Sequence, residues 1–370
     1  MPLSNPLSVI RCTNCRHPYP EQGVPHRCPA CGGLFDFAEI PAFDPAQVEK
    51  DQPGVWRYRH ALGLPTDAPQ LTLGEGNTPL VWRTAFGREV AFKLEFLNPT
   101  GSYKDRGAAT LVSFLLSRGV QAAVEDSSGN AGAAFAAYAA VAAIRAKVFA
   151  PDSASAPKRR QIKAYGAEVV RILGPRSNAA QAVLRAVEQG EVYASHAYLP
   201  HVLPGYATLA YELVEQLGAA PGAVILPVGQ GNLLLSIGRG FESLLRSQQI
   251  ERLPRLVGVQ AMACAPLWAL YRYGAAGLAW AAEGETLAEG VRVRHPARGD
   301  AVMQMIARQQ GILTAVEEAD ILPGRGELAR LGFYIEPTSA IVWNALGQLI
   351  DQLPQPIVVV LTGSGLKASA

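Results

Sequence analysis

The sequence of 370 residues lacks the features that mark membrane, secreted and nucleic-acid-binding proteins. No apolar run reaches the ~18 residues that a transmembrane helix needs. No basic stripe is interleaved with aromatic side chains, and the side-chain charges sum to only +2, so nucleic-acid binding has little support. Segment 1–6 has neither the charged start nor the apolar stretch of a secretory signal. We therefore expect a cytoplasmic protein without membrane or nucleic-acid partners.

Cysteine is also scarce, with five residues, yet four of them lie within the first 31 positions. Cys12 and Cys15 form one Cys-x-x-Cys pair, and Cys28 and Cys31 form a second, a spacing typical of a tetrahedral structural zinc site. Two disulfides are disfavoured in a cytosolic chain, and the ribbon-like spacing disfavours two redox motifs. Cys264 stands alone in an apolar segment, where we expect a small buried residue.

Hydrophobic residues make up 49% of the chain, enough for a large core and two or three domains. Beyond position 80 the predicted strands and helices alternate, which indicates parallel sheets with right-handed crossovers. The sequence thus predicts an α/β fold with two parallel-sheet domains. The expected divisions are a zinc ribbon at 1–40, a wrapping linker at 41–80 and a main region at 81–370, which consists of a smaller α/β subdomain at about 110–205 and a larger α/β subdomain formed by the remainder.

Secondary structure is predicted from short β-branched runs and from helical periodicity. Strands are expected at 90–94, 121–125, 146–150, 168–172, 223–228, 255–260 and 356–361. Helices are expected at 107–116, 131–143, 158–165, 179–188, 208–217, 233–245, 301–309, 316–322 and 339–352.

The most informative segment is 97–107, Leu-Asn-Pro-Thr-Gly-Ser-Tyr-Lys-Asp-Arg-Gly. It places Lys104 between a turn and a predicted helix, where a ligand can reach the amine. Lysine forms Schiff bases with carbonyl cofactors, and it acts as nucleophile or base when its site is sheltered. A lone lysine beside Asp105 and Arg106 would be interpreted as a surface residue, but three further segments suit the same kind of ligand.

Two of these segments are strand-to-helix loops. Residues 126–134, Asp-Ser-Ser-Gly-Asn-Ala-Gly-Ala-Ala, present Asn130 as a donor, although an N-cap alone would explain this pattern. Residues 223–234 pass through Gly229-Gln230-Gly231, where exposed N–H groups and a helix N-terminus suit a phosphate monoester. The second loop is not a nucleotide P-loop or a dinucleotide fingerprint, because neither pattern is matched.

The last segment, 357–367, reads Ile-Val-Val-Val-Leu-Thr-Gly-Ser-Gly-Leu-Lys. Its continuous β-branched run predicts a buried parallel strand. Thr362 and Ser364 stand at the carboxyl end of that strand, where open α/β sheets bind ligands.

Together these segments resemble the fold type II pyridoxal-phosphate enzymes, and most closely the threonine synthase branch. The pattern Asn-Pro-Thr-Gly-Ser-Phe-Lys-Asp-Arg-Gly stands at 98–107, with Tyr103 in place of Phe. Further family patterns are Gly-Glu-Gly-x-Thr-Pro-Leu at 74–80, Ser-Ser-Gly-Asn at 127–130, Glu-Pro-x-Ser-Ala at 336–340 and Thr-Gly-x-Gly-Leu-Lys at 362–367. Members of this branch often carry an N-terminal zinc ribbon as well.

The resemblance implies a role for each segment. Lys104 would carry pyridoxal 5′-phosphate through its amine and shuttle protons, Asn130 would bond the ring oxygen, and Thr362 would face the pyridine nitrogen. The cofactor's phosphate would be bound by the loop residues Gly229, Gln230, Gly231, Asn232 and Leu233. A hydroxyl is a weaker partner for the nitrogen than an aspartate, which suits elimination and replacement at Cβ or Cγ better than transamination.

The branch acts on O-phosphohomoserine, so the resemblance implies a pocket for a second phosphate. Here the chain departs from the family pattern: Ala131 stands for Thr, Leu199 for Asn, Ala207 for Lys and Ser364 for His. Loss of a cation and a hydroxyl weakens charge-assisted bonds to phosphate. The residues expected to contact the substrate are Ser102, Ser127, Ser128, Ser195 and Lys158, with His196, His201, Arg159 and Arg160 as further compensating groups.

Three functional hypotheses follow. The first is a lyase of amino-acid biosynthesis, a threonine synthase that converts O-phosphohomoserine and water to threonine and phosphate. The second is another β-elimination or β-replacement enzyme of this fold, either serine/threonine dehydratase-like or cysteine-forming. The third is a non-catalytic pyridoxal-phosphate-binding protein that docks through its ribbon, against which the intact Lys104, Asn130 and Thr362 argue. A homodimer is an open alternative for the assembly.

Overall fold

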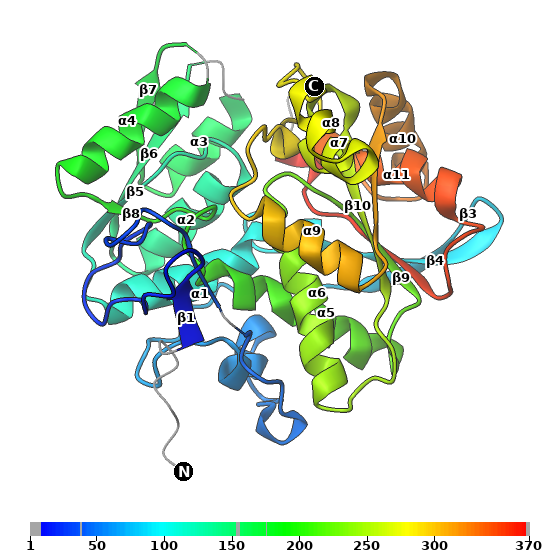
Figure 1. Ribbon diagram of the computed structural model, residues 1–370, viewed down its shortest axis with the longest axis horizontal. Coiled ribbons are helices and arrows are strands. Elements are labelled where there is room, and N and C mark those ends of the chain that lie inside the picture. The colour runs from blue at the N-terminus through cyan, green and yellow to red at the C-terminus, as the bar shows by residue number, and fades with distance from the viewer. Residues whose placement is uncertain (1–8, 38, 153–155, 175, 368–370) are drawn as a thin grey trace. The chain divides into compact units, whose positions relative to one another are not determined.

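The computed structural model describes residues 9–37, 39–152, 156–174 and 176–367. Segment 1–6, on which the expectation about a secretory signal rests, lies outside this described part. Contacts divide the chain into two compact units, whose elements are labelled in Figure 1. Unit 1 comprises Met1–Gly76, Lys104–Tyr206 and Ser369–Ala370, and unit 2 comprises Asn77–Tyr103 and Ala207–Ala368.

Unit 1 contains a four-stranded parallel sheet in the order β7-β6-β5-β8 and a two-stranded antiparallel pair, β1-β2. The alanine-rich helix α2 is buried along most of its length, because small side chains let α1, α3 and β6 approach it closely. The strands are β1 (Ile10–Cys12), β2 (Phe35–Phe37), β5 (Ala122–Glu125), β6 (Arg145–Pro151), β7 (Glu168–Ile172) and β8 (Val192–Tyr193). The helices are α1 (Lys104–Ser117), α2 (Asn130–Val141), α3 (Ala156–Ala164) and α4 (Arg176–Glu188), with short 3₁₀ helices at Pro45–Gln47 and Gly54–Ala61.

Unit 2 contains a six-stranded sheet in the order β11-β10-β9-β12-β4-β3, in which only the β3–β4 pair is antiparallel. The strands are β3 (Leu80–Ala85), β4 (Arg88–Lys93), β9 (Ala223–Pro227), β10 (Arg255–Ala261), β11 (Ile312–Val316) and β12 (Ile357–Val360). The helices are α6 (Asn232–Arg246), α7 (Pro266–Tyr273), α8 (Ala275–Trp280), α9 (Gly299–Arg308), α10 (Glu318–Arg330) and α11 (Pro337–Leu349). Along the chain, α5 (Val202–Leu217) begins in unit 1 and ends in unit 2.

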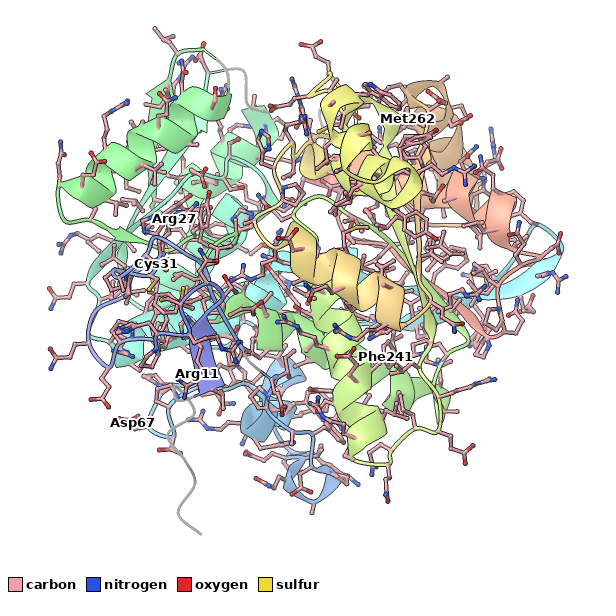
Figure 2. All side chains as sticks on the ribbon, in the orientation of Figure 1. Arg11, Arg27, Cys31, Asp67, Phe241 and Met262 are labelled. Carbon is pink, nitrogen blue, oxygen red and sulfur yellow. The ribbon has the colours of Figure 1, made fainter. Side chains whose placement is uncertain are left out.

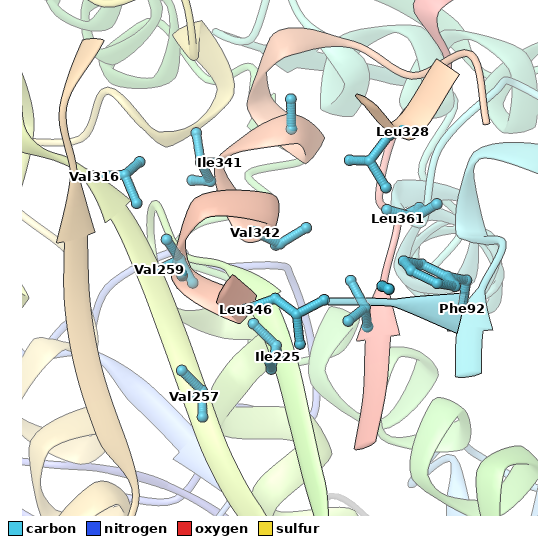
Figure 3. Packing of buried hydrophobic residues seen from close by; sticks show 14 of the residues in the cluster. Phe92, Ile225, Val257, Val259, Val316, Leu328, Ile341, Val342, Leu346 and Leu361 are labelled. Carbon is cyan, nitrogen blue, oxygen red and sulfur yellow. The ribbon is translucent and has the colours of Figure 1, made fainter. Parts of the chain in front are cut away.

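The hydrophobic core of unit 2 forms where α11 covers one face of this sheet (Figure 3). Ile341 and Leu346 of the helix lie over Ile225 of β9 and Val259 of β10, and all four side chains are buried. Every residue of β12 is buried, as expected for a central strand covered on both faces. This packed base fixes the loops that leave the carboxyl ends of β9 and β12.

The predicted α/β class with parallel sheets is confirmed, and each predicted strand has a counterpart in the structure. The helix predicted at 316–322 is wrong at its start, because Val316 ends β11 and the acidic first turn of α10 begins at Glu318. Sequence reasoning missed the edge strand β3, the short β8, the strand β11 and the helices α7 and α8. Within the described ranges, no helix is both long enough and apolar enough to cross a bilayer.

Candidate active site and metal centre

Lys104 is the first residue of α1 and lines a small hollow within unit 1, which we call the lysine hollow. Its Nζ lies 5.8 Å from the centre of the Tyr206 ring. Apart from the lysine, the ionisable groups in the lining are Glu125, His196 and the Tyr206 phenol, and the remaining walls are apolar. The lining consists of Lys104, Ala108, Leu111, Glu125, Ala131, Phe135, Ala194, His196, Val202 and Tyr206.

Two other lysines, Lys93 at the end of β4 and Lys367 at the end of the motif at 362–367, have structural roles in unit 2. Lys93 is fully buried and donates from Nζ to Glu212 Oε2 at 2.8 Å and to the Thr78 carbonyl at 2.7 Å. Lys367 donates to the carbonyl of Thr100 at 2.7 Å. Both amines therefore stabilise the fold, whereas Lys104 opens onto a hollow.

The turn that precedes Lys104 is fastened to the segment after β12 by backbone hydrogen bonds within unit 2. Tyr103 N donates to the Thr362 carbonyl at 3.1 Å, and Ser364 N donates to the Gly101 carbonyl at 3.0 Å. Gly101 has φ +85°, and a Cβ there would lie 2.9 Å from the Lys367 side chain. Ser102 is fully buried, and its hydroxyl oxygen has no hydrogen-bond partner among the described residues. These backbone hydrogen bonds therefore fix the position of the Pro-Thr-Gly-Ser turn that precedes Lys104.

Thr362 is oriented by a residue whose role sequence reasoning missed. The Ser339 and Thr362 hydroxyl oxygens lie 2.8 Å apart, and Gly363 N donates to Ser339 Oγ at 2.8 Å. Ser339 stands in the first turn of α11, so the Glu-Pro-x-Ser-Ala motif itself signals this contact. When Ser339 donates to Thr362, the threonine hydroxyl can in turn donate its proton to a ring nitrogen.

The loop from β9 to α6 has the geometry of an anion site. Gly231 is the N-cap of α6 with φ +81°, and no side chain caps the helix. The first N–H groups of a helix lack intrahelical partners and carry its positive end. A Cβ at Gly229 would lie 2.9 Å from the Gly290 carbonyl, so only glycine lets the backbone close in here. The side-chain oxygen of Gln230 accepts from Ala297 N at 3.0 Å and is therefore already engaged.

The loop from β5 to α2 differs because it offers side chains. Ser127, Ser128 and Asn130 are each half-buried, and Gly129 is an N-cap without a capping side chain. Gly129 N donates to Ser127 Oγ at 3.3 Å. A Cβ at Gly132 would lie 1.7 Å from the Ser127 carbonyl, so α2 folds back against its own entry loop.

The predicted substrate residues differ in their settings. Lys158 is buried and lies one turn before Ile162 on α3. The Cδ1 atom of Ile162 would lie 3.3 Å from a Cβ at Gly132. Lys158 therefore shares the α3 face that packs on the first turn of α2. Ser195 Oγ accepts from the Ala197 and Tyr198 amides at 3.3 Å each, which stabilises its own turn. Arg160 is exposed.

The predicted site residues fall in both units. Lys104, Ser127, Ser128, Asn130, Lys158 and Ser195 belong to unit 1, and Ser102, Thr362 and the loop from Gly229 to Leu233 belong to unit 2. Sequence reasoning missed Glu125, which is buried and accepts from both the ring and the backbone of His196. Its position as the last residue of a predicted parallel strand could have indicated a site residue, because ligands bind at the carboxyl ends of such strands.

The four N-terminal cysteine sulfurs form a cluster in which all atoms lie within 4.8 Å of one another. The Sγ distances are 3.4 Å for Cys12–Cys31, 3.6 Å for Cys15–Cys28 and 3.4 Å for Cys15–Cys31. Four ligands about 2.3 Å from a tetrahedral zinc would have sulfurs about 3.8 Å apart, so the thiols fit such an ion. Figure 2 labels Cys31 in this ribbon.

The pKa shifts of two of the thiols are compatible with a cation in this cluster. Burial raises the pKa of Cys12, but backbone amides of Cys15 and Asn14 outweigh it and bring that pKa to about 7. The backbone at His17 lowers the pKa of Cys15, yet the neighbouring thiols of Cys31 and Cys28 raise it to about 12. Without a cation, therefore, the second thiol resists ionisation beside the first, and a bound metal ion would remove that conflict.

The ribbon packs against the rest of unit 1. Tyr19 contacts the Phe114 and His201 rings with centroids 6.0 Å and 5.1 Å away, and Arg118 donates to the Pro20 carbonyl at 2.9 Å. His26 lies 5.3 Å from the ring centre of Tyr193. The thiol cluster is thereby tied to α1 and to the segment after β8.

The chain is similar to known enzymes over most of its length. Residues 71–363 match the family described as pyridoxal-phosphate dependent enzyme. The threonine synthase of Methanosarcina acetivorans is 30% identical across 97% of this chain and 92% of its own length, and that of Synechocystis sp. is 36% identical across 84% and 82%. The crystal structure of the T.th. threonine deaminase is 27% identical with a TM-score of 0.66, covering 78% of this chain and 92% of its own.

Maize serine racemase, at 21% identity and a TM-score of 0.67, shares the fold over 78% of this chain and 88% of its own. The family match spans the motifs around Lys104, the Gly229 loop and Thr362, and the relatives cover the chain almost end to end. The chain therefore belongs to the fold type II pyridoxal-phosphate-dependent enzymes, as a lyase-type member.

Proposed function

We propose that this enzyme is a threonine synthase, which converts O-phosphohomoserine and water to threonine and phosphate. The observation that carries the proposal is that Lys104 lines the lysine hollow and stands at the lysine of the family motif. The chain around it is similar to threonine synthases over more than four fifths of its length. An amine in a sheltered hollow can act as both nucleophile and base.

The residues fit pyridoxal 5′-phosphate as the cofactor. The Gly229–Leu233 amides would bind its phosphate, Asn130 its ring oxygen, Thr362 its pyridine nitrogen, and Lys104 its aldehyde carbon. The uncapped α6 and the glycine cradle support the first of these assignments, because a side chain at Gly229 would fill the space. When bound, the cofactor draws electrons from bonds at the substrate's Cα.

The protein side chains have separate tasks in the proposed reaction. Lys104 takes the proton from the substrate carbon and returns it later. The Ser339–Thr362 hydroxyl pair offers the ring nitrogen a neutral partner, since neither oxygen carries a charge. A neutral partner withdraws electrons less strongly than an aspartate, which favours elimination over transamination.

We assign the second phosphate, that of the substrate, to the loop before α2. Ser127 and Ser128 supply hydroxyls and the uncapped N-terminus of α2 supplies the positive end of a helix. Lys158 is the cation that compensates for Ala207, because it is buried on the α3 face that packs against the first turn of α2, directly after this loop. Ser102 and Ser195 complete the proposed substrate set, although the hydroxyl of Ser195 already accepts two backbone bonds.

The test is phosphate release and product analysis with O-phosphohomoserine, beside ammonia release from serine and threonine. Lys158→Gln should raise KM for O-phosphohomoserine by about tenfold or more, since a bond to a charged group contributes about 1.5–3 kcal/mol. It should leave serine and threonine turnover unchanged. Lys163→Gln is the matched control, because Lys163 is exposed on the same helix. A wild-type protein that ignores O-phosphohomoserine contradicts the proposal.

β-Elimination on serine or threonine is the second candidate. It is favoured by the lining of the lysine hollow, in which Ala131 and Val202 are apolar and Lys104 is the one lysine or arginine among the lining residues. A pocket of that kind suits a hydroxyl-bearing side chain. Ammonia release from threonine without phosphate release from O-phosphohomoserine would select this activity.

We also propose that the four thiolates bind one structural zinc ion and that a small amino acid is the substrate partner. We further propose that the chain divides into a ribbon at 1–40, a linker at 41–80 and two subdomains within 81–370. Elemental analysis of freshly prepared, reduced protein should find one zinc per chain, and its absence would contradict the metal assignment.

A further inference from the structure

The lysine hollow contains an acid–imidazole pair that the roles above do not use. Glu125 Oε1 lies 2.9 Å from His196 Nδ1, and His196 N donates to Glu125 Oε2 at 3.2 Å. The Glu125 carboxylate is buried, and 14% of the His196 side chain is exposed. Both residues line the hollow together with Lys104.

The imidazole is held in place from several sides. Glu125 is the last residue of β5, so the sheet fixes its backbone. The segment that carries His196 is anchored by Tyr193, whose hydroxyl donates to Asp126 Oδ1 at 2.8 Å. The ribbon adds the ring of His26 against Tyr193 and the guanidinium of Arg27 at 4.9 Å from the Tyr198 ring centre. Such support is typical of a side chain whose orientation matters.

The Glu125–His196 pair assigns different roles to the two ring nitrogens of His196. Because Nδ1 is engaged by the Glu125 carboxylate, Nε2 is the ring atom through which His196 can exchange a proton with a ligand. The carboxylate stabilises the protonated imidazole, and it also keeps the ring oriented after the proton is gone. Lys104, in the same hollow, is the base of the proposed reaction, so the hollow holds both a proton acceptor and a proton donor.

We propose that His196, oriented by Glu125, is the catalytic acid that protonates the oxygen leaving from the substrate's side chain. The proposal rests on the proposed function in so far as the enzyme breaks a carbon–oxygen bond. In this step the C–O bond breaks, its electron pair stays on the oxygen, and that oxygen takes the Nε2 proton. The electrons of the adjacent C–H bond form a carbon–carbon double bond, and the amine of Lys104 takes the proton. Atoms and charges balance without an oxidant or a reductant.

The test compares leaving groups on the holoenzyme. Serine, threonine and O-phosphohomoserine lose an oxygen that needs a proton, whereas 3-chloroalanine loses chloride, which needs none. His196→Gln should lower kcat on the oxygen-bearing substrates by at least about 100-fold, the low end for general acid catalysis. Chloride release should change by no more than about threefold. Glu125→Gln should show the same selective loss at smaller size, because the ring loses its charged partner.

His201→Gln is the control for loss of an imidazole from the same segment. The His201 ring stacks on Phe114 with centroids 3.5 Å apart and does not line the hollow, so its effect should be equal on both substrate classes. Cofactor absorbance and the melting temperature of each variant separate misfolding from catalysis.

Equal losses on both classes in His196→Gln, or no loss, overturn the proposal, as does a wild-type enzyme that releases chloride alone or nothing. The two proposals can fail separately. If the wild type deaminates serine or threonine but ignores O-phosphohomoserine, the threonine synthase assignment falls while the role of His196 is still measured. If O-phosphohomoserine turnover survives His196→Gln unchanged, the role of His196 falls and the proposed function stands.

Discussion

Two loops in this enzyme run from the end of a parallel strand into a helix without a capping side chain, and they offer ligands different groups. The loop before α6 in unit 2 is built on Gly229 and Gly231, and its one long polar side chain, Gln230, is bound to a neighbouring amide. The loop before α2 in unit 1 instead carries the half-buried hydroxyls of Ser127 and Ser128. The first loop would thus bind a ligand through its backbone, and the second through its side chains.

This difference between the two loops distinguishes binding of the cofactor from selection of the substrate. Backbone amides and a helix end bind any phosphate, and they are insensitive to which residues surround them as long as glycine is kept. Hydroxyls, the buried Lys158 and the Glu125–His196 pair depend on the identity of each side chain. We therefore expect changes in the loop before α6 to affect cofactor retention, and changes in the loop before α2, at Lys158 and in the Glu125–His196 pair to affect turnover and substrate choice. The predictions below test this division, from the largest effect to the smallest.

Lys104→Ala should abolish turnover while the cofactor's phosphate site in unit 2 stays intact. We expect a loss of at least about 10³-fold in kcat, within the range of about 10²–10⁴-fold for general acid–base residues. Borohydride reduction of the wild type should fix the cofactor on Lys104. A label on Lys93 or Lys367 would contradict the assignment, although both amines are engaged in structural bonds.

The ribbon should matter for stability more than for chemistry. Cys12→Ser removes one ligand of the proposed zinc site, and it should cost at least about 3 kcal/mol, a fraction of the about 10–16 kcal/mol that structural zinc contributes in small domains. Thermal unfolding with and without a chelator measures this. Cys264→Ser is the control, because Cys264 is a buried thiol away from the cluster. An equal loss in both variants would reject a metal role.

Sequence reasoning predicted the parts that depend on local rules and missed those that depend on distant pairing. The strand β12 and the thiol spacing are encoded in short, contiguous patterns, so the buried strand and the cysteine cluster could be foreseen. The Ser339–Thr362 bond joins residues 23 positions apart, and Glu125 meets His196 across 71 positions. Propensity and periodicity do not report such contacts, because they arise only when strands and helices are assembled. The edge strand β3 was missed because its residues 82–84 are exposed and lack an apolar alternation.

The two N-cap glycines allow a matched test of the two loops. Gly231 has φ +81°, and a Cβ there would lie 2.6 Å from Val302 Cγ2. Gly129 has φ −97°, and its Cβ would meet only Ser127 Oγ at 3.8 Å. Gly231→Ala should therefore cost about 1–3 kcal/mol of backbone strain and weaken cofactor retention by roughly tenfold or more. Gly129→Ala should leave retention nearly unchanged. Cofactor titration followed by absorbance distinguishes the two, and equal affinities would remove the distinction between the loops.

The smallest expected effect concerns the hydroxyl pair in unit 2. Thr362→Ala should keep the cofactor bound but slow the proton removal at Cα, because the ring nitrogen loses its partner. The loss should be about 2–10-fold, the size of a neutral hydrogen bond of about 0.5–1.5 kcal/mol. Thr362→Asp should raise transamination at the expense of elimination, since a carboxylate keeps the nitrogen protonated.

Ser339→Ala serves as the intermediate case: it leaves the Thr362 hydroxyl in place and removes only the group that orients it. Its loss should therefore fall between the wild type and Thr362→Ala. Product partition between keto acid and amine transfer measures all three. An unchanged partition in the aspartate variant would mean that Thr362 does not face the ring, and unit 2 would then bind the cofactor through its phosphate loop alone.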